Sequence, residues 1–137
     1  ANYEGVAISS VTANSTDNDY SEYDGILESR TFDTGHEDGV TVNSITWQGT
    51  AGGTGSHVKF QIASSDSSSG PWVFKGDAGT TDSYYEIVGS TPADPGQPIP
   101  VRSIDHNNHR YFRYRIFIGN GAGPSPIVEK VNVNWSP

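Results

Sequence analysis

Alternation of apolar and polar side chains recurs along this chain, and it restricts the fold more than any other feature of the sequence. In SHVKFQIAS, residues 56–64, Val58, Phe60 and Ile62 share one parity, whereas Lys59 and Gln61 share the other. Successive side chains of a β-strand point to opposite faces, so this pattern predicts a half-buried strand. Helical spacing is almost absent, which predicts an all-β protein.

Two further stretches, 111–119 and 127–135, repeat the pattern. The side predicted to face the core carries Phe112, Tyr114, Ile116 and Ile118 in the first stretch and Val131, Val133 and Trp135 in the second. The opposite side of the first stretch carries Tyr111, Arg113, Arg115 and Phe117. The arginine stems can cover apolar surface there while their charged ends stay in water.

Weaker strand candidates are 5–12, 25–32, 40–49, 72–75, 83–88 and 99–104. Within 40–49, Val40 and Val42 differ in parity from Ile45 and Trp47, which predicts a β-bulge near Asn43. Segments rich in Gly, Ser, Asp, Asn and Pro separate the candidates. Short strands spaced in this way predict an antiparallel β-sandwich, jelly-roll-like, with about nine strands.

The length of 137 residues fits a single β-sandwich domain spanning 1–137. Residues 1–24 are expected to form an N-terminal strand and a polar acidic loop, and residues 25–137 the rest of the sandwich. The sequence contains no cysteine, which excludes disulfides and Cys-based zinc sites.

The charge and the composition narrow the class of protein. A formal net charge of −8 argues against nucleic acid and anionic membranes as partners, and no apolar run is long enough for a transmembrane helix. Sixteen glycines and only 18% charged residues are typical of exported β proteins. A secreted, extracellular or cell-surface location is therefore expected.

The segment STDNDYSEYDG, residues 15–25, is the strongest candidate for a metal site. Its side-chain oxygens come from Asp17, Asp19, Ser21, Glu22 and Asp24. Calcium prefers six to eight oxygen ligands, and short acidic side chains in a turn can converge on one ion. The segment lacks the full EF-hand pattern, so a solvated connection between strands remains the alternative.

Aromatic residues near loops are candidates for stacking on sugar rings. They are Tyr20, Tyr23, Trp72, Tyr84 and Tyr85. The alternative is that they pack at the ends of the sandwich, because buried aromatic rings dominate core energetics. A calcium-stabilised carbohydrate-binding module, lectin-like or adhesin-like, with a glycan as its partner, is one functional hypothesis.

No pattern specifies catalysis, and the chain is expected not to be an enzyme. His106 and His109 in DHNNHR are interpreted as part of a turn, because two imidazoles and one nearby carboxylate are too few to predict zinc. The acidic segment DTGHEDG, residues 33–39, is likewise interpreted as a turn. No cofactor other than calcium is expected.

Five blocks of the sequence resemble one family. LESRTFDTG, NSITWQG, VKFQIASSDSSSGPW, HNNHRYFRYRIFI and VNVNWSP, all within residues 25–137, resemble the C-terminal β domains of bacterial type IV pilin-like and other cell-surface filament proteins. The resemblance implies an exported β-sandwich that is the outer head or a structural subunit of a filament. Its partners would be other filament subunits, and no catalytic residue is carried over.

One departure from that family bears on the partners. A conventional type IV pilin begins with a long apolar helix, and the sequence here contains no such run. Either the helix was removed, or it belongs to a separate helical pilin chain, as in split pilins, or the resemblance reports only a shared surface module. The last alternative leaves the adhesin role open.

Overall fold

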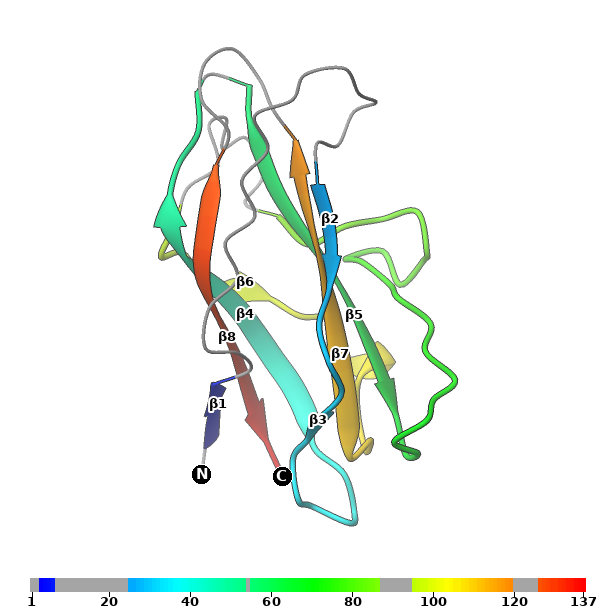
Figure 1. The fold of residues 1–137 in the computed structure, drawn as a ribbon. Helices are drawn as coiled ribbons and strands as arrows, with labels where there is room; N and C mark the ends of the chain where they lie inside the picture. The colour runs from blue at the N-terminus through cyan, green and yellow to red at the C-terminus, as the bar shows by residue number, and fades with distance from the viewer. Residues whose placement is uncertain (1–2, 7–24, 54, 87–94, 120–125) are drawn as a thin grey trace.

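The computed structural model describes residues 3–6, 25–53, 55–86, 95–119 and 126–137 (Figure 1). Within these residues the protein is all-β. The elements are β1 (Tyr3–Val6), β2 (Gly25–Glu28), β3 (Phe32–Asp33), β4 (Thr41–Thr50), β5 (His57–Ser65), β6 (Ile99–Pro100), the 3-10 helix η1 (Ser103–Asp105), β7 (Tyr111–Gly119) and β8 (Ile127–Ser136). No helix in this part of the chain is long and apolar enough to cross a membrane.

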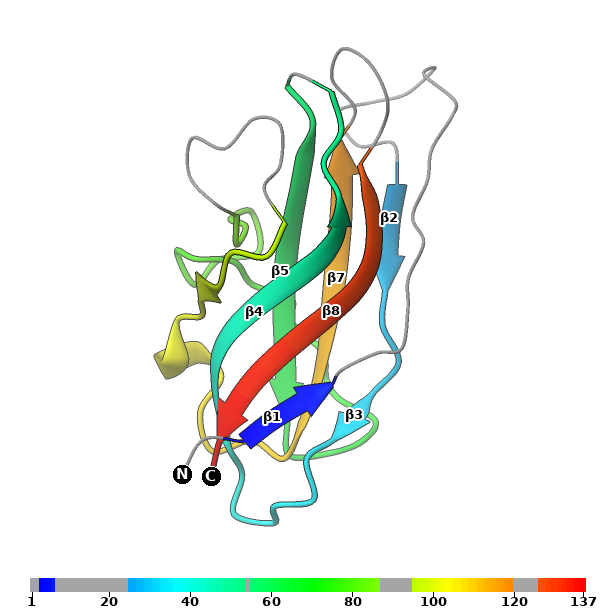
Figure 2. The same ribbon diagram turned by 90° about the vertical axis from the view of Figure 1, so that its left-hand side faces the viewer.

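The strands form two antiparallel sheets. The first has the order β1-β8-β4-β6 and is called the β8 sheet here. In the second, the β7 sheet, β5 pairs with one edge of β7 along its length, while β2 and β3 pair with successive parts of the other edge. Figure 2 shows β4 and β8 crossing in front of β5 and β7, so the two sheets lie face to face.

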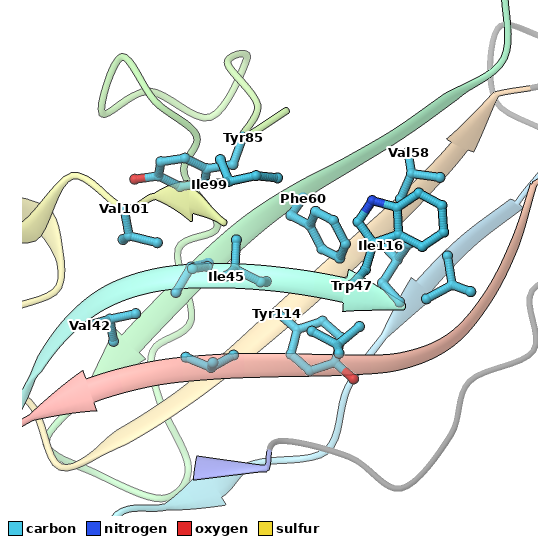
Figure 3. Close-up of a cluster of buried hydrophobic side chains, with 14 of the residues drawn as sticks. Val42, Ile45, Trp47, Val58, Phe60, Tyr85, Ile99, Val101, Tyr114 and Ile116 are labelled. Carbon is cyan, nitrogen blue, oxygen red and sulfur yellow. The ribbon is translucent and has the colours of Figure 1, made fainter. Parts of the chain in front are cut away.

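One hydrophobic core fills the space between the two sheets (Figure 3). The β8 sheet contributes Val42, Ile45, Trp47, Ile99, Val128, Val131 and Val133, and the β7 sheet contributes Phe32, Val58, Phe60, Ile62, Phe112, Tyr114, Ile116 and Ile118. Burial of each large apolar side chain stabilises the fold by about 1.5–3 kcal/mol. The core therefore fixes which face of each strand points outward.

The alternation predicted for the longest strands is confirmed. Val58, Phe60 and Ile62 of β5 are all buried in this core, as are the even-numbered residues 112–118 of β7. The pairing of β4 with β8 shifts register between Val42 and Ser44, which is the predicted bulge at Asn43. The bulge allows residues of opposite parity on either side of it to face the same core.

The number and extent of the shorter strands differ from the prediction. The segments 72–75 and 83–88 were expected to be strands, but their described residues pair only through single bridges, Lys75 with Ile62 and Tyr85 with Phe60. β1 occupies 3–6, and most of the predicted strand 5–12 lies outside the described residues.

The predicted strand 25–32 is divided into β2 and β3 at Ser29, where a hydrogen bond to a side chain replaces one to the backbone. The backbone N–H of Ser29 donates to the carbonyl of Tyr114 at 2.9 Å, and the N–H of Tyr114 donates to Ser29 Oγ at 3.0 Å. A side-chain oxygen thus takes the place of a backbone carbonyl at this point of the ladder. Serine competes with regular pairing in this way because its hydroxyl lies close to the backbone.

Candidate functional site

The acidic loop predicted to bind calcium lies outside the described residues. This applies to Asp17, Asp19, Ser21, Glu22 and Asp24, and also to Tyr20 and Tyr23. In the part of the chain that the structure describes, no three His, Asp or Glu side chains are grouped so that they could hold a metal ion. Calcium binding by the loop stays a prediction.

The second acidic segment, DTGHEDG, begins with a turn at Asp33. The N–H of Gly35 donates to Asp33 Oδ1 at 2.8 Å, and Arg110 donates to both carboxylate oxygens at 2.8 and 3.0 Å. These hydrogen bonds favour the charged carboxylate, and the bond from Arg110 is the main reason that the pKa of Asp33 lies below its usual value. The Asp33 carboxylate therefore belongs to an ion pair with Arg110, the residue before β7.

The outward face of the β7 sheet carries a row of aromatic rings and cations. The ring of Trp72 lies 4.8 Å from the guanidinium of Arg113, and the ring of Phe74 lies 3.9 Å from that of Arg115. These distances are within the range of cation–π attraction. Because the two arginines are alternate residues of β7, the segment around residues 72–74 runs along the outside of that strand.

Tyr84 continues this row beyond the second arginine. Its ring meets that of Phe117 edge-on at 5.0 Å, and the ammonium group of Lys59 lies 5.2 Å from its centre. Trp72 and Tyr84 are both partly exposed, so these two of the predicted sugar-stacking residues lie on one face. They contact β7 residues four positions apart, which corresponds to about 13 Å along a strand.

Tyr85 points the other way, into the core. Its side chain is only 1% exposed, and its hydroxyl accepts a hydrogen bond from the backbone N–H of Arg102 at 3.0 Å. Figure 3 shows the ring beside Ile99, with the oxygen directed away from Phe60. The ring of Tyr85 is consequently not part of an exposed platform.

One carboxylate ties the two arginines of this face together. Glu28 Oε2 accepts from Arg113 at 2.9 Å, and Glu28 Oε1 accepts from Arg115 at 3.0 Å. Arg113 also donates to Thr31 Oγ1 at 2.8 Å. The guanidinium groups are thereby held beside the aromatic rings, and the Glu28 side chain of β2 is fastened to β7.

β2 itself exposes apolar side chains. Ile26 is 57% exposed and Leu27 is 37% exposed, and the backbone of β2 pairs only with β7 among the described residues. An edge strand has one row of backbone N–H and C=O groups that its own sheet does not use. The exposed apolar side chains and the open backbone edge of β2 together form a candidate surface for contact with another protein.

A separate cavity of about 510 Å³ opens beside the end of β5. Its walls are formed by Ser64, Ser65, Asp66, Ser67, Pro71, Val73, Lys75, Asp105, His106 and His109. The walls therefore combine hydroxyl groups, two imidazoles and both signs of charge with the apolar pair Pro71 and Val73.

Three side chains of this cavity share two hydrogen bonds. Ser64 Oγ lies 2.9 Å from Nδ1 of His106 and 2.7 Å from Nδ1 of His109. A serine hydroxyl has one proton, so it donates to one imidazole and accepts from the other, which carries its proton on Nδ1. This cluster is not predictable from the sequence, because Ser64 lies far from the histidines along the chain and is one of many serines.

The turn that carries the two histidines is fixed to the start of β4. The N–H groups of Val40 and Val42 donate to the carbonyls of His109 and His106, each at 3.0 Å. Asn108 between them has a positive φ of 62°. A Cβ atom on Gly39 would lie 2.2 Å from the carbonyl carbon of Asn108, so this approach requires glycine.

Burial keeps His106 neutral. The side chain is 1% exposed, and loss of hydration lowers its pKa to about 4, although the nearby Asp105 carboxylate acts in the opposite direction. Nε2 of this ring has no hydrogen-bond partner among the residues that the structure describes. His106 is thus a buried imidazole with one nitrogen bound to Ser64 and the other unsatisfied.

Two charged groups lie near this imidazole. Asp105 Oδ2 lies 3.0 Å from Nε of Arg102 and forms an ion pair with it. The two groups are not aligned as a hydrogen bond, and this oxygen has no hydrogen-bond partner among the described residues. The Lys75 side chain forms no ion pair with the described residues, and its charge contributes to the low pKa of His106. The cavity therefore holds one ammonium group that no carboxylate neutralises directly.

Comparisons with protein-family models, with curated proteins and with solved structures found no match to this chain.

Proposed function

We propose that this chain is a non-enzymatic, extracellular structural protein, a subunit or head domain of a type IV pilus-like surface filament. The resemblance of five sequence blocks to pilin-like domains motivates the proposal. The observation that carries it in the fold is β2, an edge strand whose apolar residues Ile26 and Leu27 are exposed. Edge strands and their neighbouring side chains are common sites of contact between protein chains.

The strand order supports the jelly-roll-like architecture expected of such a head. The β8 sheet has the order β1-β8-β4-β6, and the bridges at Lys75 and Tyr85 extend the β7 sheet beyond β5. The eight strands and the bridged segments at Lys75 and Tyr85 are distributed over the two layers that this architecture requires. Jelly rolls are stable without disulfides when their two sheets bury a sufficient core, which suits a chain without cysteine.

The Ser64 cluster is compatible with a role other than catalysis. Both histidines use Nδ1 to hold one hydroxyl, and their carbonyls anchor the turn to β4. A hydroxyl fixed between two imidazoles joins β5 to the turn at 106–109 and stabilises this end of the domain. No catalytic step is therefore proposed for the Ser64 cluster.

The experiment is to follow the chain into filaments sheared from the cells that produce it. We expect the chain in the filament fraction, and we expect Ile26→Asp to reduce its amount there at least tenfold without lowering the melting temperature of the isolated chain. Ile104→Asp is the matched control, because Ile104 is 76% exposed but lies outside β2. Absence of the unaltered chain from the filament fraction, or equal loss with both variants, would contradict the proposal.

A second candidate function is glycan binding on the outward face of the β7 sheet, as in a calcium-stabilised lectin-like or adhesin module. The observation that favours it is the placement of Trp72 and Tyr84, both partly exposed, over the same strand. A glycan array with and without a calcium chelator tests it. Binding that Trp72→Ala and Tyr84→Ala both remove would support this function, and an array without any signal would exclude it.

A further inference from the structure

The cavity beside the end of β5 has walls of three chemical kinds. Pro71 and Val73 form an apolar side, and the Val73 side chain is 48% exposed. Lys75 contributes an ammonium group that has no ion-pair partner among the described residues. Asp66 and the serines at 64, 65 and 67 contribute a carboxylate and hydroxyl groups. These features do not take part in the filament contact proposed above.

The chemistry of these walls indicates which groups a ligand would have to supply. An ammonium group favours a carboxylate, and a charged hydrogen bond contributes about 1.5–3 kcal/mol when it forms. The serine hydroxyls of the walls favour further hydroxyls, because a hydroxyl can either donate to them or accept from them. A carbon skeleton can lie against the apolar wall.

The carboxylates at the cavity add a second requirement. Asp105 is held by Arg102 at 3.0 Å, so its charge is balanced from outside the cavity. Asp66 is exposed and can accept hydrogen bonds from hydroxyl groups at the entrance. A ligand with several hydroxyls and one carboxylate matches this arrangement better than a doubly charged anion, which Asp66 would repel.

We propose that this cavity binds a small hydroxylated carboxylate of the uronic acid type. The carboxylate pairs with Lys75, hydroxyls donate to Asp66 at the entrance, and the carbon face of the ring lies on Pro71 and Val73. The hydrogen bonds of Ser64 to both histidines fix this wall of the cavity before the ligand arrives, which reduces the entropy that its side chains lose on binding.

The test is a titration of the full chain with glucuronate, followed by chemical shifts of the backbone amides. Glucose has comparable hydroxyls without the carboxylate, and acetate has the carboxylate without the hydroxyls. We expect glucuronate to bind at least tenfold more tightly than either, with the shifts confined to residues 64–67, 71–75 and 105–109. Equal binding of all three compounds, no binding, or shifts elsewhere would overturn the proposal.

Two variants connect the binding to the cavity. Lys75→Gln is expected to weaken glucuronate binding about tenfold and to leave glucose unaffected, the change expected when one charged hydrogen bond is lost. Lys130→Gln makes the same change of charge on the exposed part of β8 and should have no effect. If Lys75→Gln does not fold, Val73→Glu serves instead, because its carboxylate would repel the ligand. Undiminished binding by the folded variant would refute the assignment.

Discussion

The guanidinium of Arg115 lies 3.9 Å from the centre of the Phe74 ring, which is only 5% exposed. The same guanidinium shares the carboxylate of Glu28 with Arg113, whose own guanidinium lies over Trp72. A single acidic residue of an edge strand therefore positions two cations of the central strand β7 against two aromatic rings.

Replacement of Glu28 by Gln should lower stability in a manner that depends on salt. The variant loses both ion pairs, and because the groups are more than a quarter exposed the expected loss is about 1 kcal/mol at low ionic strength. The loss should shrink in 1 M salt, where exposed charges are screened. Urea unfolding at both salt concentrations measures it. Glu129→Gln, on the exposed side of β8, is the control and should change little.

Two tyrosines of the core should respond in opposite ways to the loss of the hydroxyl group. The buried hydroxyl of Tyr114 has no hydrogen-bond partner within the described part of the chain, so Tyr114→Phe should raise the free energy of unfolding by about 1 kcal/mol. The hydroxyl of Tyr85 accepts from the N–H of Arg102, so Tyr85→Phe should lower it by a similar amount. Urea unfolding of the two variants compares them directly. If Tyr85→Phe instead raised the free energy of unfolding, the hydrogen bond of Tyr85 would contribute less than the burial of its hydroxyl costs.

Gly39 should be much less tolerant of alanine than Gly35. Both have positive φ, 85° and 79°, which costs a residue with a Cβ about 1–2 kcal/mol. Only at Gly39 would the new atom collide with backbone, 2.2 Å from the carbonyl carbon of Asn108, whereas nothing lies within 4 Å at Gly35. We therefore expect Gly39→Ala to lose several kcal/mol or fail to fold. Equal melting temperatures for the two variants would disprove the close approach.

Acid should destabilise the domain partly through His106. Its pKa is about 4 in the folded chain against the ordinary value of 6.5, so the unfolded chain binds the proton more readily. The stability present above pH 6.5 is then lost as the pH falls toward 4, by an amount on the order of 3 kcal/mol. His106→Gln should flatten the dependence between pH 6.5 and 4, as measured by urea unfolding at several pH values. An unchanged slope in that variant would assign the effect to other groups.

The longest strands could be predicted from the sequence, because their alternation is strong and one core decides which side is buried. The parity change at Asn43 was sufficient to locate the bulge of β4. The break between β2 and β3 was not predictable, because it depends on the contact of Ser29 with Tyr114, far away along the chain. The same limit applies to Tyr84 and Tyr85: alternation places them on opposite sides, but only the bridge from Tyr85 to Phe60 shows which side is the core.

The cavity and the cluster of Ser64, His106 and His109 could not be predicted either, because they too depend on contacts between distant segments. A pair of histidines three residues apart suggested a turn, and the structure agrees, but neither their common partner nor their burial follows from local spacing. Ser64 meets them because the pairing of β5 with β7 brings Ser64 opposite Phe112, just beyond that turn. Sites of this kind depend on strand register, which arises only when the two sheets assemble.

The position of β8 between β1 and β4 affects the order in which the chain can fold during synthesis. Thr41 pairs with Ser136 and Tyr3 with Trp135, so the centre of the β8 sheet comes from the last residues described. Until those residues leave the ribosome, β1 and β4 lack the strand that lies between them, and the edge of β4 that pairs with β8 stays open. Contacts between such distant segments slow folding and prolong exposure of unpaired edges. A nascent chain of this topology would therefore benefit from a chaperone that covers β4 until β8 has emerged.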